Sequence, residues 1–222
     1  MNTNGNMYEG VVTWNPLAGE CPHRCGYCSS HSFMRYPEFA KKYSGELRFI
    51  YSHPEKPKDG QVVFVVGQND LFAKAVPDSF IEQTINICKR FDYTYLFQSK
   101  NPERFIEFLG HFPPRTILCT TIETNNWYEQ MGTAPVPSLR ARAMNKITGY
   151  EKHVTIEPVM SFNLNHLLFL IRMCHPSVVN LGADSKRHNL PEPSREDVLA
   201  LIYELKKFTV VKQKSNLERL LR

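Results

Sequence analysis

Three cysteines within eight residues make Cys21 to Cys28 the part of this chain best suited to chemistry. The stretch reads Cys-Pro-His-Arg-Cys-Gly-Tyr-Cys, which spaces the thiols as C-x3-C-x2-C. Thiolates are the ligands that soft metals and iron–sulfur clusters prefer. Because no fourth cysteine lies nearby, such a site leaves one metal position open to a ligand that the protein does not supply.

The elements that must position these cysteines follow a regular rhythm of β-branched strand, polar turn and amphipathic helix. A continuous apolar run such as Val62 to Val66 is typical of a strand buried on both faces of a parallel sheet. We expect strands at 8–14, 62–66, 93–97, 115–122, 153–156, 177–181 and 209–211, and helices at 29–43, 78–90, 101–109, 138–148, 163–174 and 194–207. Six β/α units and a seventh strand predict a parallel sheet with helices outside it.

Length and composition are those of one globular domain. The chain has 222 residues, of which 42% are hydrophobic, and this is enough for one sizeable core. We expect a single domain over 1–222, with the cysteine loop at 15–30, β/α units to about 208 and a short strand and helix at 209–222. No stretch is long and apolar enough for a membrane span, and 1–7 lacks the order of a signal peptide.

The cysteines and the net charge indicate the cellular compartment and the kind of partner. Cys88, Cys119 and Cys174 lie singly in apolar stretches, so we expect small buried hydrophobic side chains in a reducing, cytoplasmic compartment rather than a disulfide framework. The net charge of +5 permits an anionic partner without requiring one, since the basic residues are dispersed.

Nearly every expected strand ends in polar residues. The carboxyl ends of parallel strands meet at one rim, where β/α proteins place their functional loops. The cysteine loop comes after the first strand, and the later strand ends carry Asn69, Asp70, Gln98, Lys100, Thr121, Glu123, Asn125, Glu157, Asp184, Lys212 and Gln213. This rim is therefore the predicted site.

The cysteine spacing, the aromatic Tyr27 before the last cysteine and the position after a first strand resemble the radical S-adenosylmethionine (radical SAM) superfamily. The resemblance implies a partial (β/α)6-type, TIM-like barrel, with Cys21, Cys25 and Cys28 as ligands of a [4Fe-4S] cluster. It also implies an enzyme in which an external electron donor reduces the cluster, S-adenosylmethionine is cleaved to a 5′-deoxyadenosyl radical, and hydrogen is abstracted from a substrate.

Further stretches, in order along nearly the whole chain, look like a small radical-SAM-like family that is often encoded by phages. They are Trp14-Asn15-Pro16, Val63-Phe64-Val65 with Asn69-Asp70-Leu71-Phe72, Gln98 to Arg104, Thr121 to Asn125, Ile156 to Val159, Val179 to Asp184, and Val211-Lys212-Gln213. This resemblance names no substrate.

The superfamily resemblance also implies roles around the rim. Gly67, Asn69 and Asp70 stand where the superfamily commonly has Gly-Gly-Glu, which contacts the methionine amino group, so the match here is partial. Thr121, Glu123 and Asn125 alternate along an extended segment, which predicts convergence on one ligand, and Tyr27 offers a flat face near the cluster. Glu157 is a candidate contact to the ribose of S-adenosylmethionine or to a substrate. The candidate contacts to the carboxylate of S-adenosylmethionine or to a substrate are Gln98, Lys100, Lys212 and Gln213.

Two alternatives compete with this interpretation. The first is a zinc-stabilised, non-catalytic nucleic-acid-binding module, in which His23 or His31 would supply the fourth ligand of a closed site. The second is a cluster protein that binds S-adenosylmethionine without radical chemistry. Within the enzyme interpretation, an incomplete barrel and the mild basic charge favour a large substrate such as nucleic acid.

Overall fold

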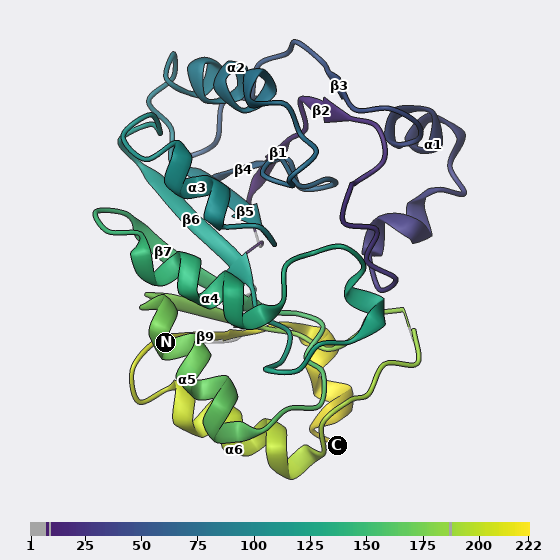
Figure 1. Cartoon of the computed structure of the whole chain (residues 1–222), viewed down its shortest axis with the longest axis vertical. Helices are drawn as coiled ribbons and strands as arrows, with labels where there is room; N and C mark the ends of the chain where they lie inside the picture. The colour runs from purple at the N-terminus through teal and green to yellow at the C-terminus, as the bar shows by residue number, and fades with distance from the viewer. Residues whose placement is uncertain (1–7, 9, 187) are drawn as a thin grey trace.

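The computed structural model describes residues 8, 10–186 and 188–222 (Figure 1). The segment 1–7 and Glu9, which belongs to the expected first strand, lie outside the described residues. Seven parallel strands form one sheet, and their spatial order is their order along the chain. They are β1 (Val12–Trp14), β4 (Val63–Val65), β5 (Tyr95–Ser99), β6 (Thr116–Thr121), β7 (Glu151–Ile156), β8 (Val178–Leu181) and β9 (Val210–Gln213).

Helices connect these strands, which confirms the predicted alternation in a single α/β domain. They are α1 (Pro37–Tyr43), α2 (Asp78–Cys88), α3 (Glu103–Glu107), α4 (Pro137–Lys146), α5 (Leu164–Cys174) and α6 (Arg195–Leu205). Right-handed crossovers between neighbouring strands place successive helices on the same face of a sheet. Accordingly α3, α4, α5 and α6 pack side by side in that order (Figure 1).

The two faces of the sheet bury different side chains, as the period of two in a strand requires. Val65, Phe97 and Val154 belong to the large core beneath the helices. On the opposite face a smaller cluster contains Leu96 and Cys119. Cys88, Cys119 and Cys174 are all fully buried, so the prediction of small buried cysteines is confirmed.

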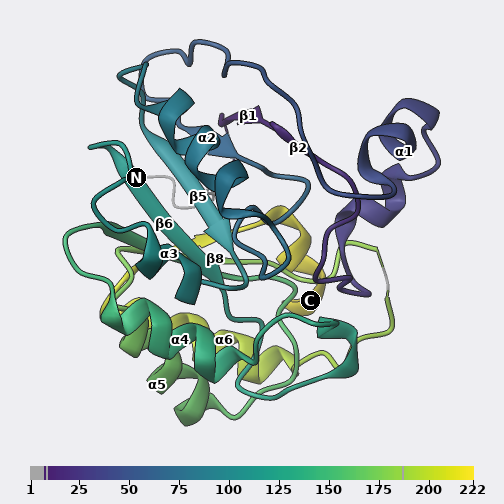
Figure 2. The same cartoon turned by 45° about the horizontal axis from the view of Figure 1, so that its top comes forward.

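The helix expected over 29–43 is broken into two pieces. A 3-10 helix covers Ser29–Phe33, and α1 begins only at Pro37. Proline disfavours the helical conformation in the residue before it, and Tyr36 is extended, with φ −91° and ψ 120°. As a result α1 projects from the body of the molecule beside the cysteine loop (Figure 2).

A short antiparallel strand pair lies beside the cysteine loop, and only its second strand falls in a segment, 47–51, that the sequence indicates as extended. β2 (Leu17–Ala18) lies inside the predicted cysteine loop and pairs antiparallel with β3 (Arg48–Phe49). Two residues are too few to show the alternation from which strands are recognised. The pair anchors the start of the cysteine loop, because Leu17 and Ala18 are fully buried.

β1 and β9 are the two edges of the sheet, so the described strands do not close into a complete ring. The last residues form a 3-10 helix, Ser215–Leu220, within the segment 209–222 where a short strand and helix were expected. Within the described ranges, no helix has the length and apolar character needed to cross a membrane.

Candidate functional site

The carboxyl ends of the strands surround a cavity of about 700 Å³. Polar groups from successive β/α units line it, as the rim prediction requires. Of the predicted site residues, the cavity is lined by Cys21, Cys25, Tyr27, Cys28, Gly67, Asn69, Asp70, Gln98, Lys100, Thr121 and Glu157. The structure therefore brings together residues that lie up to 136 positions apart, from Cys21 to Glu157.

The cysteine loop is held in place by the segment between β6 and α4. The amide of Gly26 donates to the carbonyl of Gln130 at 2.8 Å, and the amide of Thr133 donates to the carbonyl of His23 at 2.9 Å. Gly132 has φ +61°, and a Cβ atom there would lie 2.0 Å from the His23 carbonyl oxygen. Only glycine fits at this contact, so the backbones of the two loops can approach closely.

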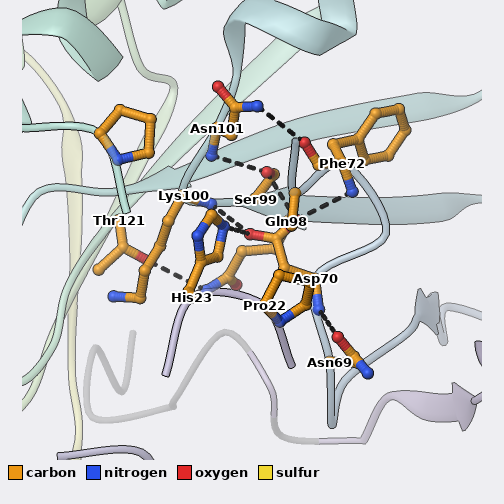
Figure 3. A network of polar contacts seen from close by, with 12 residues as sticks. Pro22, His23, Asn69, Asp70, Phe72, Gln98, Ser99, Lys100, Asn101 and Thr121 are labelled. Atoms are coloured by element: carbon orange, nitrogen blue, oxygen red, sulfur yellow. Dashed lines mark hydrogen bonds and ion pairs between the residues drawn. The ribbon is translucent and has the colours of Figure 1, made fainter. Parts of the chain in front are cut away.

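A buried carboxylate joins this loop to two strand ends (Figure 3). Asp70 Oδ2 accepts hydrogen bonds from His23 Nε2 at 2.9 Å and from the Lys100 amide at 2.7 Å. Asp70 Oδ1 accepts from Ser99 Oγ at 2.7 Å and from the Phe72 amide at 3.0 Å. A carboxylate has about four acceptor positions, so these donors fill them. Asp70 lines the cavity but fixes the chain, and it has no position left for a ligand ammonium.

The charge on Asp70 is stabilised by the same contacts. Burial alone would raise the pKa of its carboxyl group, but the interaction with His23 and the hydrogen bonds from His23, Ser99 and the Lys100 amide lower it below the ordinary value. Asn69 also has a structural contact, since its side-chain amide donates to the Gly19 carbonyl at 2.9 Å.

A second buried carboxylate organises the wall behind Tyr27. Glu123 is fully buried and accepts from the Tyr27 hydroxyl at 2.5 Å, from Arg140 Nη1 at 2.8 Å and from the Lys100 ammonium. Lys100 Nζ also lies 5.0 Å from the centre of the Tyr27 ring. We call Tyr27, Lys100, Glu123 and Arg140 the Glu123 network. Burial would raise the pKa of Glu123, but Arg140 and Lys100 lower it to about 2.

The opposite wall of the cavity is built from the ends of the last strands. Lys214 pairs with Glu157 at 2.5 Å, and a Cβ atom on Gly182 would collide with both side chains. Lys214 Nζ also lies 5.6 Å from the centre of the Tyr8 ring, and the Tyr8 hydroxyl donates to Gln98. Burial, with Cys119 and Glu157 adding to it, raises the pKa of Tyr8 well above its ordinary value.

Several predicted residues do not reach the cavity. Of Thr121, Glu123 and Asn125, only Thr121 lines it, so the structure does not bring these three side chains together at the cavity. The backbone leaves the strand at Ile122, and Asn125 instead accepts from the Asn163 amide at 2.7 Å. Lys212 and Gln213 are also absent from the lining, where Lys214 takes the place expected for them.

The sequence reasoning missed several residues of the site. Lys214 follows β9 directly, so its position at a strand end was the available signal. Arg140 lies within α4 and His23 lies between two cysteines. No sequence pattern around either residue predicts that it forms a buried ion pair. His188 was not expected at the site either; it lines the cavity and pairs at 2.7 Å with Asp184, a strand-end residue that was expected at the rim.

The cysteine loop offers three thiols that could each hold one iron of a cluster. Cys21, Cys25 and Cys28 are free thiols on one side of the cavity. Burial, and then the charge of Asp70, raises the pKa of Cys21 to about 12. Among the residues described, no three His, Cys, Asp or Glu side chains surround one point closely enough to hold one metal ion. A cluster differs in that each cysteine binds its own iron.

No family model, curated protein or solved structure matches the chain.

Proposed function

We propose that this chain is a radical SAM enzyme, with Cys21, Cys25 and Cys28 as ligands of a [4Fe-4S] cluster and S-adenosylmethionine as cofactor. The observation that carries the proposal is the opening of three free thiols, spaced C-x3-C-x2-C after the first parallel strand, into a cavity at the carboxyl ends of that sheet. When bound, the two groups supply reductive cleavage of the sulfonium and abstraction of hydrogen from a substrate.

Some residues of the chain hold the cysteine loop in place, and others line the cavity where the cofactor would bind. The Asp70 carboxylate and Gly132 hold the cysteine loop, while Glu123 fixes Tyr27 through its hydroxyl. Gly67 and the Asn69 backbone stand at the cavity for the methionine amino group. The polar side chains that line the cavity, where the nucleoside, the carboxylate or a substrate would lie, include Gln98, Lys100, Thr121, Glu157 and Lys214.

The finer fold that we propose is a partial barrel. Parallel strands in sequential order, with helices packed side by side, are the arrangement of a β/α barrel. The opening would lie between the edge strands β1 and β9. Such an opening admits a large substrate, and the net charge of +5 supports an anionic one such as nucleic acid. Its binding should then weaken as salt rises, and binding insensitive to salt would contradict this choice.

A zinc-binding module has weaker support. A structural zinc ion holds its thiolates about 2.3 Å away around one centre, and the described residues show no such convergence. His23, one of the expected fourth ligands, instead pairs with Asp70. We also propose a reducing, cytoplasmic setting and an external electron donor, since free thiols and a reducible cluster require them.

The decisive experiment is anaerobic reconstitution with iron and sulfide, followed by analysis of bound iron and zinc and by incubation with dithionite and S-adenosylmethionine. We expect coloured protein that forms 5′-deoxyadenosine. Cys25→Ala should lose both properties, whereas Cys88→Ala, which truncates a buried cysteine that does not line the cavity, should keep them. A colourless zinc protein would overturn the proposal, and a cluster that never yields 5′-deoxyadenosine would reduce it to binding without radical chemistry.

A further inference from the structure

The Glu123 network carries more positive than negative charge. Lys100 and Arg140 are its two cations, and Glu123 is its one carboxylate, which leaves one surplus positive charge. The side chains of Glu123 and Arg140 are fully buried and that of Lys100 is 18% exposed. Charges removed from water act on their neighbours far more strongly than charges at a surface.

This surplus charge lies against the cysteine loop. Lys100 Nζ is 3.2 Å from the Tyr27 hydroxyl, and Tyr27 stands between two of the cysteines. Lys100 Nζ also lies 5.0 Å from the centre of the Tyr27 ring, so its charge is held against the backbone segment that joins Cys25 to Cys28. Lys100 also lines the cavity, whereas Arg140 does not.

We infer that Lys100 is a positioning residue that sets the reduction potential of the cluster, by making the Glu123 network positive where the cysteine loop meets the cavity. The inference rests on the proposed function. Reduction adds one electron, taken from a low-potential one-electron donor, and thus one negative charge to the cluster, with no bond made or broken. A neighbouring surplus of positive charge stabilises the more negative state and raises the potential.

The effect of charge on the potential can be separated from the effect of packing, because substitutions in the Glu123 network can either raise or lower its net charge. Lys100→Met removes the surplus, and Glu123→Gln doubles it. The double variant, with Arg140 as the remaining charge, restores the original value. Lys100→Arg keeps the charge and is the conservative control. If Lys100 only held the cysteine loop in place, all the variants that break the network would shift the potential in the same direction.

The test is a potentiometric titration of the reconstituted protein, followed by electron paramagnetic resonance in the absence of S-adenosylmethionine. We expect Lys100→Met to disfavour reduction about tenfold, which is a fall of about 59 mV for one electron. Glu123→Gln should raise the potential, and the double variant should return near wild type. Should Glu123→Gln fail to fold, the comparison of Lys100→Met with Lys100→Arg tests the inference. Only Lys100→Met should then shift the reduction potential, because only it removes the charge.

The outcomes separate this inference from the proposed function. A wild-type protein without a cluster would overturn both. A wild-type cluster whose potential is the same in Lys100→Met and Lys100→Arg would overturn only the role of Lys100. Potential shifts of the same sign in Lys100→Met and Glu123→Gln would also overturn the role of Lys100, because these substitutions change the charge of the network in opposite directions.

Discussion

His23 Nε2 lies 2.9 Å from Asp70 Oδ2, and this buried contact ties the middle of the cysteine loop to the end of the next strand in the sheet. Both side chains are nearly inaccessible to solvent. Asp70 simultaneously accepts from Ser99 and from the Lys100 amide at the end of β5. One carboxylate thus aligns three neighbouring segments around the cavity, which makes it the contact on which the geometry of the loop most depends.

Asp70→Asn should loosen the cysteine loop. An amide oxygen cannot accept all four hydrogen bonds, so one or more buried donors lose their partners, at about 1–3 kcal/mol each. We expect a lower free energy of unfolding in urea and faster hydrogen exchange at 21–28. Asp92→Asn, at an exposed aspartate whose side-chain ion pair lies at the surface, is the control and should change neither measurement. Unchanged exchange in Asp70→Asn would show that the loop does not depend on this carboxylate.

Gly132→Ala should disturb the cysteine loop more than the same change at Gly110. Both glycines have positive φ, +61° and +84°, so alanine is strained at either position, and the ψ of −134° at Gly132 lies outside the left-handed helical region that alanine can enter at a cost of about 1–2 kcal/mol. At Gly132 the new Cβ would also lie 2.0 Å from the His23 carbonyl oxygen, whereas at Gly110 nothing lies within 4 Å. Thermal unfolding and iron content after reconstitution measure the difference. Equal losses in the two variants would refute the close contact.

Glu123 should make stability depend on acid pH. Its pKa falls from the usual 4.5 to about 2 in the folded chain, so its ionised form stabilises the fold above about pH 4.5. This contribution, on the order of 3 kcal/mol, is lost as the pH falls from there towards 2. Urea unfolding between pH 7 and pH 2.5 measures it. Glu123→Gln should be less stable than wild type at pH 7, and its deficit should shrink in acid. A deficit that stays constant with pH would contradict the lowered pKa.

Lys214 and Lys212 should differ in their effect on ligand binding. Lys214 lines the cavity and pairs with Glu157, whereas Lys212 does not line it. We expect Lys214→Met to weaken binding of S-adenosylmethionine about tenfold, which corresponds to about 1.4 kcal/mol, and Lys212→Met to leave it unchanged. Anaerobic equilibrium dialysis of the reconstituted protein measures both. The opposite ranking would restore the sequence-based choice of Lys212.

Much of the fold followed from the pattern of the sequence, because β-branched runs and amphipathic segments are local and periodic. All seven parallel strands were expected within a few residues of their observed bounds. The exceptions have local causes as well. Pro37 divided an expected helix, and β2 was too short to show any alternation.

The sequence by itself determined the cysteine spacing, the sheet and the polar strand ends, since each of these is written in consecutive residues. Only the tertiary structure decided which polar side chains face the cavity and which are consumed in holding it. Asp70 and Glu123 looked like ligand contacts, but their acceptor positions are occupied by donors from distant segments, His23 and Arg140 among them. Partners of a buried carboxylate are chosen by how the segments pack, and no spacing along the chain records that choice.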